Sequence, residues 1–253
     1  MHLEEKRLFW CGLPLTLKDD NLVFGKETKE IKPSIRYFED LKSVLIEAPN
    51  DSKSAAYFMY RDVCLEKDRK KIEENNLRYD ITIIPASVIG KEFVKTFGHS
   101  HPMVDASKLA FPEVYEVISG MGHFILQGKN ECFVVEARAG DHVLIGPNLG
   151  HVTINPFNET LVLANWVERN FVSDYSEIKE KHGAAFYETT NGWIKNAYYL
   201  ENFSLRFFKS KSVPELGLNN GKPMYELVEH IEKLEFLKNP KKFERVFEEY
   251  FKS

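Results

Sequence analysis

Two histidines one residue apart, His99 and His101, are the residues whose types and spacing most clearly suggest chemistry. Side chains alternate along an extended strand, so both imidazoles would project from the same face. A carboxylate, Glu113, and a third histidine, His151, follow later in the chain. Three imidazole nitrogens and one carboxylate oxygen suit a first-row divalent metal and leave coordination positions open for water or a substrate. We therefore expect these four side chains to hold one divalent metal ion.

The elements that must position these residues are predicted to be short strands. Apolar or alternating runs occupy 79–84, 114–118, 123–127, 132–136, 142–145, 151–155 and 160–167. Glycine, proline, asparagine and aspartate separate them, a pattern typical of a β-sandwich or barrel. Glu116 is a competitor for the ligand role of Glu113. The alternation of a strand places it on the opposite face from Glu113 and Tyr115.

The regions on either side of these strands have a different pattern. The segment 35–46 suggests a short helix, 55–60 a strand, and the charge-dense 67–75 a solvated turn or loop. A short helix is also expected within 176–190.

Beyond Pro214 the apolar residues follow a helical period and form two stripes. The first stripe is Leu227, Val228, Ile231 and Leu234, and the second is Phe243, Val246, Phe247, Tyr250 and Phe251. Both stripes are interpreted as packing faces. We expect a barrel with N-terminal strands over 1–192 and a C-terminal helical extension over 193–253. The extension would pack on the barrel or at a dimer interface.

Composition narrows the classes of partner. The 253 residues include 34 Lys and Arg against 38 Asp and Glu, which gives a net charge of −4. This balance gives no reason to expect nucleic acid as a partner, and no apolar run is long enough to span a membrane. Three widely spaced cysteines, Cys11, Cys64 and Cys132, argue against a disulfide framework and favour a cytoplasmic location.

A second motif surrounds the third histidine. It comprises Gly140, Asp141, Pro147, His151 and Asn155. Together with the first motif, which runs from the histidine pair through Glu113 to Gly120, this order resembles the cupin superfamily. The resemblance implies a mainly β fold, a jelly-roll-like barrel with an N-terminal extension and C-terminal helices. The interval between His101 and Glu113 is longer than in most cupins and must be a loop.

A closer resemblance is to the cupin-type phosphoglucose isomerases of archaea and some bacteria, and it covers roughly 34–192. The residues that carry it are Gly90-Lys91-Glu92-Phe93, Thr96, Gly98, His99, His101, Pro112-Glu113-Val114-Tyr115, Gly120, Gly122, Gln127, His151, Thr153, Asn155 and Asp174-Tyr175. The same resemblance implies that His99, His101, Glu113 and His151 are the metal ligands.

The resemblance also implies roles for residues around the metal. Four positions fall where the family holds the sugar phosphate: Tyr57, Thr82, Thr96 and Gly98. Tyr115 and Tyr175 match residues that line the sugar site, and Tyr115 is expected to take part in catalysis. Two positions depart from the family, since Asn148 replaces a tyrosine and Ser173 replaces a histidine.

The implied activity is the interconversion of glucose 6-phosphate and fructose 6-phosphate by a metal-dependent isomerase. Glu113 would serve as the base in a proton transfer through a cis-enediol, and a metal-assisted hydride shift is the competing mechanism. Iron is the expected ion, with manganese, nickel, cobalt and zinc also compatible. The resemblance further implies a homodimer.

Two alternatives stay open at this point. One is another sugar-phosphate isomerase or epimerase of the same fold. The other is a non-catalytic cupin that binds a sugar phosphate. Fold alone does not choose between them, because one fold carries many activities.

Overall fold

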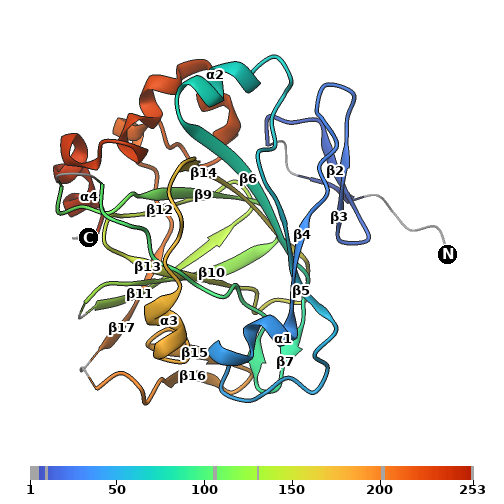
Figure 1. The fold of residues 1–253 in the computed structure, drawn as a ribbon, viewed down its shortest axis with the longest axis vertical. Helices are drawn as coiled ribbons and strands as arrows, with labels where there is room; N and C mark the ends of the chain where they lie inside the picture. Colours follow the sequence, from blue (N-terminus) through green and yellow to red (C-terminus); the bar gives the residue numbers. More distant parts are fainter. Residues whose placement is uncertain (1–5, 9–10, 105–106, 130, 201–202, 252–253) are drawn as a thin grey trace.

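The computed structural model describes residues 6–8, 11–104, 107–129, 131–200 and 203–251 (Figure 1). The expected mainly β architecture is confirmed. A six-stranded sheet has the order β12-β9-β14-β6-β5-β4, and a four-stranded sheet has the order β13-β10-β11-β17. Side chains from both sheets form a common apolar core that includes Val117, Leu163, Phe124 and Val152. The described strands form separate open sheets rather than one closed ring.

The strands of the two large sheets fall close to the predicted runs. The six-stranded sheet contains β4 (Ser34–Tyr37), β5 (Ala55–Tyr60), β6 (Leu77–Ile84), β9 (Glu113–Ser119), β12 (His142–Ile145) and β14 (Leu161–Glu168). The four-stranded sheet contains β10 (Met121–Gln127), β11 (Glu131–Arg138), β13 (Gly150–Ile154) and β17 (Ser204–Lys209).

Two small sheets and several short helices complete the described chain. The small sheets contain β1 (Lys6–Arg7), β2 (Leu15–Lys18) and β3 (Asn21–Phe24), and β7 (Val88–Ile89), β8 (Glu92–Phe93), β15 (Phe186–Thr189) and β16 (Gly192–Lys195). The α-helices are α1 (Phe38–Leu41), α2 (Arg69–Glu74), α3 (Ser176–Glu180) and α4 (Glu244–Tyr250). The 3₁₀ helices are η1 (Lys42–Val44), η2 (Pro214–Leu216), η3 (Met224–Leu237) and η4 (Pro240–Phe243).

The C-terminal segment covers the outer face of the six-stranded sheet (Figure 1). The first predicted stripe is buried in the same apolar cluster as Tyr79, Ile81 and Trp166 from the sheet. The Trp166 indole Nε1–H donates to the Met224 carbonyl at 3.1 Å. Burial on this side explains why β6 is apolar along the face away from the other large sheet.

This segment, which was predicted to be helical, forms more 3₁₀ turns than α-helix. The long 3₁₀ element η3 has non-helical angles at His230, with φ −123° and ψ 53°. The part of the chain before η2 also contains β16, which begins at Gly192, and β17, which pairs in parallel with β11. Helical turns therefore begin at η2, and the division of the chain at 192 stays a prediction. No helix of the described residues has the length and apolar character needed to cross a membrane.

Two polar side chains attach the C-terminal segment to the sheet. Glu116 Oε2 accepts a hydrogen bond of 2.9 Å from the Met224 N–H. Its cross-strand partner His142 donates through Nε2 to the Lys222 carbonyl at 3.0 Å. Both side chains are buried and cannot bind water. These two contacts replace the hydrogen bonds to water that the side chains lose on folding.

The prediction of a loop over 67–75 is wrong, because α2 forms there. Ile72 is fully buried and gives the segment an apolar face, while Lys70 and Glu74 pair one turn apart on the exposed face. The charge-dense stretch is thus the solvated side of a helix. The predicted strand at 55–60 and the short helix within 176–190 are confirmed as β5 and α3. The segment 35–46 is divided between β4, α1 and η1.

Candidate metal centre

The strand β9 contributes the carboxylate of the site. Glu113 and Tyr115 project toward the core between the two large sheets, whereas Glu116 contacts the C-terminal segment on the other face. The predicted assignment of the two glutamates to opposite faces is confirmed. Glu113 is 3% exposed, so its charge depends on protein groups for stabilisation.

His99 and His151 are brought together by pairing between two backbone segments. The His99 N–H donates to the His151 carbonyl at 3.2 Å, and the His151 N–H donates to the His99 carbonyl at 2.9 Å. Gly98 precedes this bridge with φ +84°, and a Cβ there would lie 2.5 Å from Val152 Cγ2. Only glycine permits this close approach without strain.

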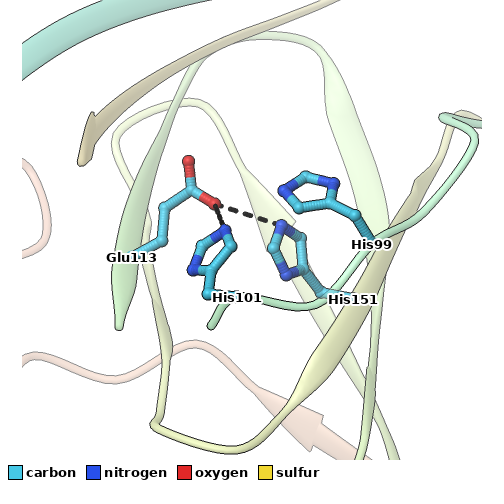
Figure 2. A group of neighbouring side chains, drawn as sticks. All are labelled: His99, His101, Glu113 and His151. Carbon is cyan, nitrogen blue, oxygen red and sulfur yellow. Dashed lines mark ion pairs between the residues drawn. The ribbon is translucent and has the colours of Figure 1, made fainter. Parts of the chain in front are cut away.

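The four predicted ligands converge on one point (Figure 2). His99, His101, Glu113 and His151 each present one ligand atom, and these atoms lie within 4.8 Å of one another. Glu113 Oε2 is 3.1 Å from His151 Nε2 and 3.5 Å from His101 Nε2. Among the residues that the structure describes, these four form the group of this kind.

Hydrogen bonds fix the protonation of one imidazole. His101 Nδ1 lies 2.8 Å from the Phe111 carbonyl, which can only accept, so Nδ1 carries the proton. Nε2 of His101 is then left with a lone pair directed at the centre, as metal-binding histidines require. Phe111 belongs to the loop between His101 and Glu113, so that loop orients a predicted ligand.

Two polar atoms of the centre lack a hydrogen-bond partner. Glu113 Oε2 and His151 Nδ1 are buried without a hydrogen-bond partner, and Tyr115 Oη is 3.3 Å from His151 Nε2. A carboxylate oxygen enclosed by imidazole nitrogens at these distances is costly unless a cation neutralises it. The donor set of three nitrogens and one oxygen fits a divalent metal ion.

Burial and the neighbouring imidazoles keep His99 and His101 neutral. Burial, followed by the neighbouring imidazoles, lowers the pKa of His99 well below 6.5. Burial lowers the pKa of His101 to about 4, although Glu113 opposes the shift. Burial alone would raise the pKa of Glu113, but the nearby imidazoles and the Arg61 guanidinium outweigh it and lower that pKa. At neutral pH the centre therefore offers neutral imidazoles at His99 and His101 and an ionised carboxylate at Glu113.

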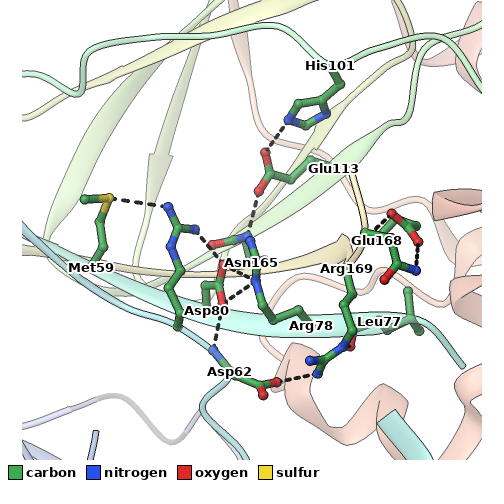
Figure 3. Close-up of polar contacts among 12 residues, drawn as sticks. Met59, Asp62, Leu77, Arg78, Asp80, His101, Glu113, Asn165, Glu168 and Arg169 are labelled. Carbon is green, nitrogen blue, oxygen red and sulfur yellow. Dashed lines mark hydrogen bonds and ion pairs between the residues drawn. The ribbon is translucent and has the colours of Figure 1, made fainter. Parts of the chain in front are cut away.

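Asn165 on β14 orients the carboxylate. Its Nδ2 donates to Glu113 Oε1 at 2.6 Å (Figure 3). Asn165 is opposite Tyr115 in the sheet register and is 2% exposed. With Oε1 held by the amide, Oε2 is directed at the imidazoles, which is the usual way in which a neighbouring group fixes a metal ligand.

A single cavity contains the centre and every other site residue predicted from the sequence. Its lining includes Tyr57, Thr82, Thr96, Gly98, Tyr115 and Tyr175 together with the four predicted ligands. Its volume of about 80 Å³ holds roughly two or three water molecules.

Three hydroxyls in this cavity, which we call the hydroxyl cluster, belong to Tyr57, Thr82 and Thr96. The Tyr57 hydroxyl oxygen accepts from the Phe97 N–H at 3.2 Å, and Thr96 Oγ1 accepts from the Thr153 N–H at 3.0 Å. Because these oxygens act as acceptors toward the backbone, their hydrogens remain available to donate to a ligand.

Comparison with known proteins agrees with this geometry. Residues 26–203 match the family model described as "Glucose-6-phosphate isomerase (GPI)", which is more than half of the chain. The chain belongs to the glucose-6-phosphate isomerase family.

Relatives named glucose-6-phosphate isomerase occur in archaea. The enzyme of Thermococcus kodakarensis is 28% identical over 65% of this chain and 84% of its own length. That of Pyrococcus furiosus is 25% identical over 65% of this chain and 85% of its own length. A solved structure of oxalate oxidase has a TM-score of 0.37 at 15% identity, covering 53% of this chain and 62% of the other. The expected cupin-type, mainly β fold is consistent with this family membership.

Sequence reasoning missed several residues of this family member's cavity. Met59, Arg61 and Arg78 line it, as does Asn165. The strand alternation contained the signal, because Tyr57, Met59 and Arg61 share one face of the β5 segment. On β6, Arg78 and Thr82 likewise lie on one face.

The two departures from the family pattern lie in different places. Ser173 lines the cavity. Asn148 instead holds the loop before Glu113, since its Oδ1 accepts from the Ala110 N–H at 2.8 Å and its Nδ2 donates to the Lys108 carbonyl at 3.1 Å.

Proposed function

We propose that this protein is a metal-dependent glucose-6-phosphate isomerase that interconverts glucose 6-phosphate and fructose 6-phosphate. The observation that carries the proposal is the presence of a three-histidine, one-glutamate centre and a hydroxyl cluster in one cavity. Membership in the glucose-6-phosphate isomerase family supports the choice of substrate.

The hydroxyl cluster and the backbone near Gly98 are the proposed phosphate site. Hydroxyl and amide donors bind phosphate oxygens and fix the position of the sugar. Thr82 is on β6, two residues from Asp80, which is opposite Asn165. Asn165 is in turn opposite Tyr115. A phosphate at Thr82 would therefore place the carbon chain along the sheet toward Glu113. Tyr175, whose ring is 5.4 Å from that of His99, would contact the sugar.

A divalent ion held by His99, His101, Glu113 and His151 would act as a Lewis acid toward the oxygens on C1 and C2. Glu113 is the proposed base: it removes the proton from C2 of the open-chain aldose and returns it to C1. The hydroxyl proton on O2 is transferred to O1 over the same sequence, so the product is the ketose. Burial and the Glu113 charge raise the pKa of Tyr115 well above 10, so its hydroxyl stays protonated and can donate to a substrate oxygen.

A coupled assay tests the proposal. The metal-loaded protein is given fructose 6-phosphate, and glucose 6-phosphate is followed through NADP reduction by glucose-6-phosphate dehydrogenase. Turnover that disappears after chelation and returns with the metal supports the isomerase. Binding of fructose 6-phosphate without turnover would instead identify a non-catalytic sugar-phosphate-binding protein. The choice of iron, the homodimer and the cytoplasmic location stay predictions.

A further inference from the structure

The cavity contains an arginine that the proposed reaction has not used. Arg61 follows β5 and lines the cavity, and its side chain is 45% exposed. Glu113, by comparison, has a side chain that is 5% exposed. Arg61 is therefore at the mouth, where a ligand would pass it, while the carboxylate is at the floor.

Arg61 is at the metal end of the cavity. Tyr57 of the hydroxyl cluster is four residues away along the same strand direction, a distance of about 13 Å in an extended chain. Arg61 pairs with Asp80, which is opposite Asn165 in the sheet register. Asn165 is in turn opposite Tyr115. Arg61 is close enough for its charge to act on both Glu113 and Tyr115.

The guanidinium of Arg61 is held by Asp80 and still has N–H groups that can donate to a ligand. Nη1 donates to Asp80 Oδ2 at 2.6 Å, and Nη2 lies 3.4 Å from the Met59 sulfur. A thioether is a weak acceptor, so an anionic oxygen would be a much better partner for Nη2.

Asp80 does not neutralise this corner of the cavity. Its buried carboxylate also accepts both contacts of 2.9 Å from Arg78 Nε, which lines the same cavity (Figure 3). Two guanidiniums share one carboxylate, which leaves one unit of positive charge beside the predicted metal ligands. A cation beside a metal centre is unfavourable unless a bound anion compensates both charges.

We propose that Arg61 is a specificity-determining residue that binds negative charge on the C1–C2 end of a sugar phosphate. This inference rests on the proposed function, because it assumes that the phosphate occupies the hydroxyl cluster. Arg61 then recognises the charge that develops on the oxygens of C1 and C2 during isomerisation. A phosphorylated sugar acid carries a stable charge at that end, and it is the ligand class that Arg61 favours.

The test compares two ligands that differ at one end. Arabinonate 5-phosphate has a carboxylate there, and arabinitol 5-phosphate has an uncharged hydroxymethyl group. Calorimetric titration of the Mn²⁺-loaded protein measures the affinity for each. Arg61→Met is expected to weaken arabinonate 5-phosphate binding by roughly 10- to 100-fold, the range for a lost charged hydrogen bond, and to change arabinitol 5-phosphate binding by less than about twofold.

Controls separate this effect from folding and net charge. Asp80 keeps Arg78 and the Asp62 N–H as partners in Arg61→Met, so the local structure retains its hydrogen bonds. Arg61→Gln, which keeps a donor for Asp80 without the charge, is expected to show the same selective loss. Arg245→Met removes an equal charge from an 88% exposed side chain and is expected to leave both affinities unchanged.

Equal weakening of both ligands in Arg61→Met and Arg61→Gln would overturn the inference, because it would show a purely structural role. Unchanged affinity for arabinonate 5-phosphate would overturn it as well. If the wild-type protein bound neither ligand, the proposed function would fail and this inference with it. The two failures are therefore distinguishable.

Discussion

Glu113 and Glu116 are three residues apart on β9 and are both buried, yet their surroundings give them opposite properties. Burial raises the pKa of Glu116 to about 8, and the Met224 N–H opposes the shift only in part. Burial also acts on Glu113, but the imidazoles and Arg61 outweigh it, so the pKa of Glu113 is lowered. The inner carboxylate is thus ready to bind a cation, while the outer one is a neutral hydrogen-bonding group at pH 7.

Burial alone therefore does not make a carboxylate functional. Both side chains lose water, and the difference comes from whether cations and hydrogen-bond donors replace it. On the outer face the C-terminal segment supplies a single backbone donor to Glu116. On the inner face three histidines and Asn165 surround Glu113.

The largest effect is expected from exchanging each carboxylate for its amide. Glu113→Gln removes the only anionic ligand of the proposed centre and the proposed base, so kcat/KM should fall by at least about 10⁴-fold. Glu116→Gln is the matched control on the same strand, and its kcat/KM should stay within about threefold of wild type. The coupled isomerase assay measures both. Similar losses of kcat/KM in the two variants would contradict the assignment of the catalytic carboxylate to the inner face.

The next effect is expected at the side chain that orients Glu113. Asn165→Ala removes the amide that holds Oε1, so Oε2 is no longer directed at the imidazoles. Metal affinity should weaken by roughly 10- to 100-fold, as for other groups that orient a metal ligand. Competition with a chelating dye measures this in wild type and variant. Unchanged affinity would mean that the imidazoles alone fix the carboxylate.

A smaller effect is expected on how the stability of the folded protein depends on pH, which Glu116 should control. The folded protein holds a proton on Glu116 up to about pH 8, whereas an ordinary carboxyl has a pKa of 4.5. The folded state therefore binds more protons in this interval, and stability decreases as the pH rises through it. Between pH 6.5 and 8 the loss should be about 1.6 kcal/mol.

Glu116→Gln keeps an oxygen for the Met224 N–H and should abolish this dependence. Urea unfolding of wild type and variant between pH 6.5 and 9 measures it as a difference, in which the contributions of His142, whose pKa burial lowers to about 4, and of the other histidines cancel. A difference in stability that stays flat over this range would contradict the assignment of a neutral outer carboxyl.

The smallest effect is expected from the loop that orients His101. Asn148→Ala removes two hydrogen bonds to the loop and should destabilise the protein by about 1 kcal/mol. Asn148 also has φ +64°, so Asn148→Gly serves as a control that relieves the backbone without restoring the side chain. Both variants should speed hydrogen exchange of the Ala110 amide. Normal exchange in both would mean that the loop is held by other contacts.

Much of the candidate site followed from the sequence because its residues are concentrated in two ordered motifs. His99, His101, Glu113 and His151 were predicted together, and the structure brings them together. Strand alternation also assigned Glu116 to the outer face correctly. These are local rules, and they worked where the strands are regular.

The parts that were missed depend on contacts across the sheet. Strand alternation groups Arg61 with Tyr57, but the proximity of Arg61 to Glu113 depends on the register of β5, β6, β14 and β9, which no single strand specifies. The contact of Asn165 with Glu113 depends on the same register. The helix α2 was hidden by its charges, since Ile72 is its one buried residue. The second apolar stripe of the C-terminal segment was recognised as a packing face and lies mostly in α4, whereas the first stripe lies in the 3₁₀ element η3, which its helical period did not distinguish from an α-helix.

The most direct test of the central claim is a metal titration of the metal-free protein with fructose 6-phosphate turnover and bound metal measured on the same samples. The account predicts that Fe²⁺ or Mn²⁺ restores turnover in proportion to bound metal and that both saturate at one ion per chain. Glu113→Gln should lose both, and Glu116→Gln should match wild type. Full turnover in the metal-free protein, or saturation without any turnover, would contradict the account.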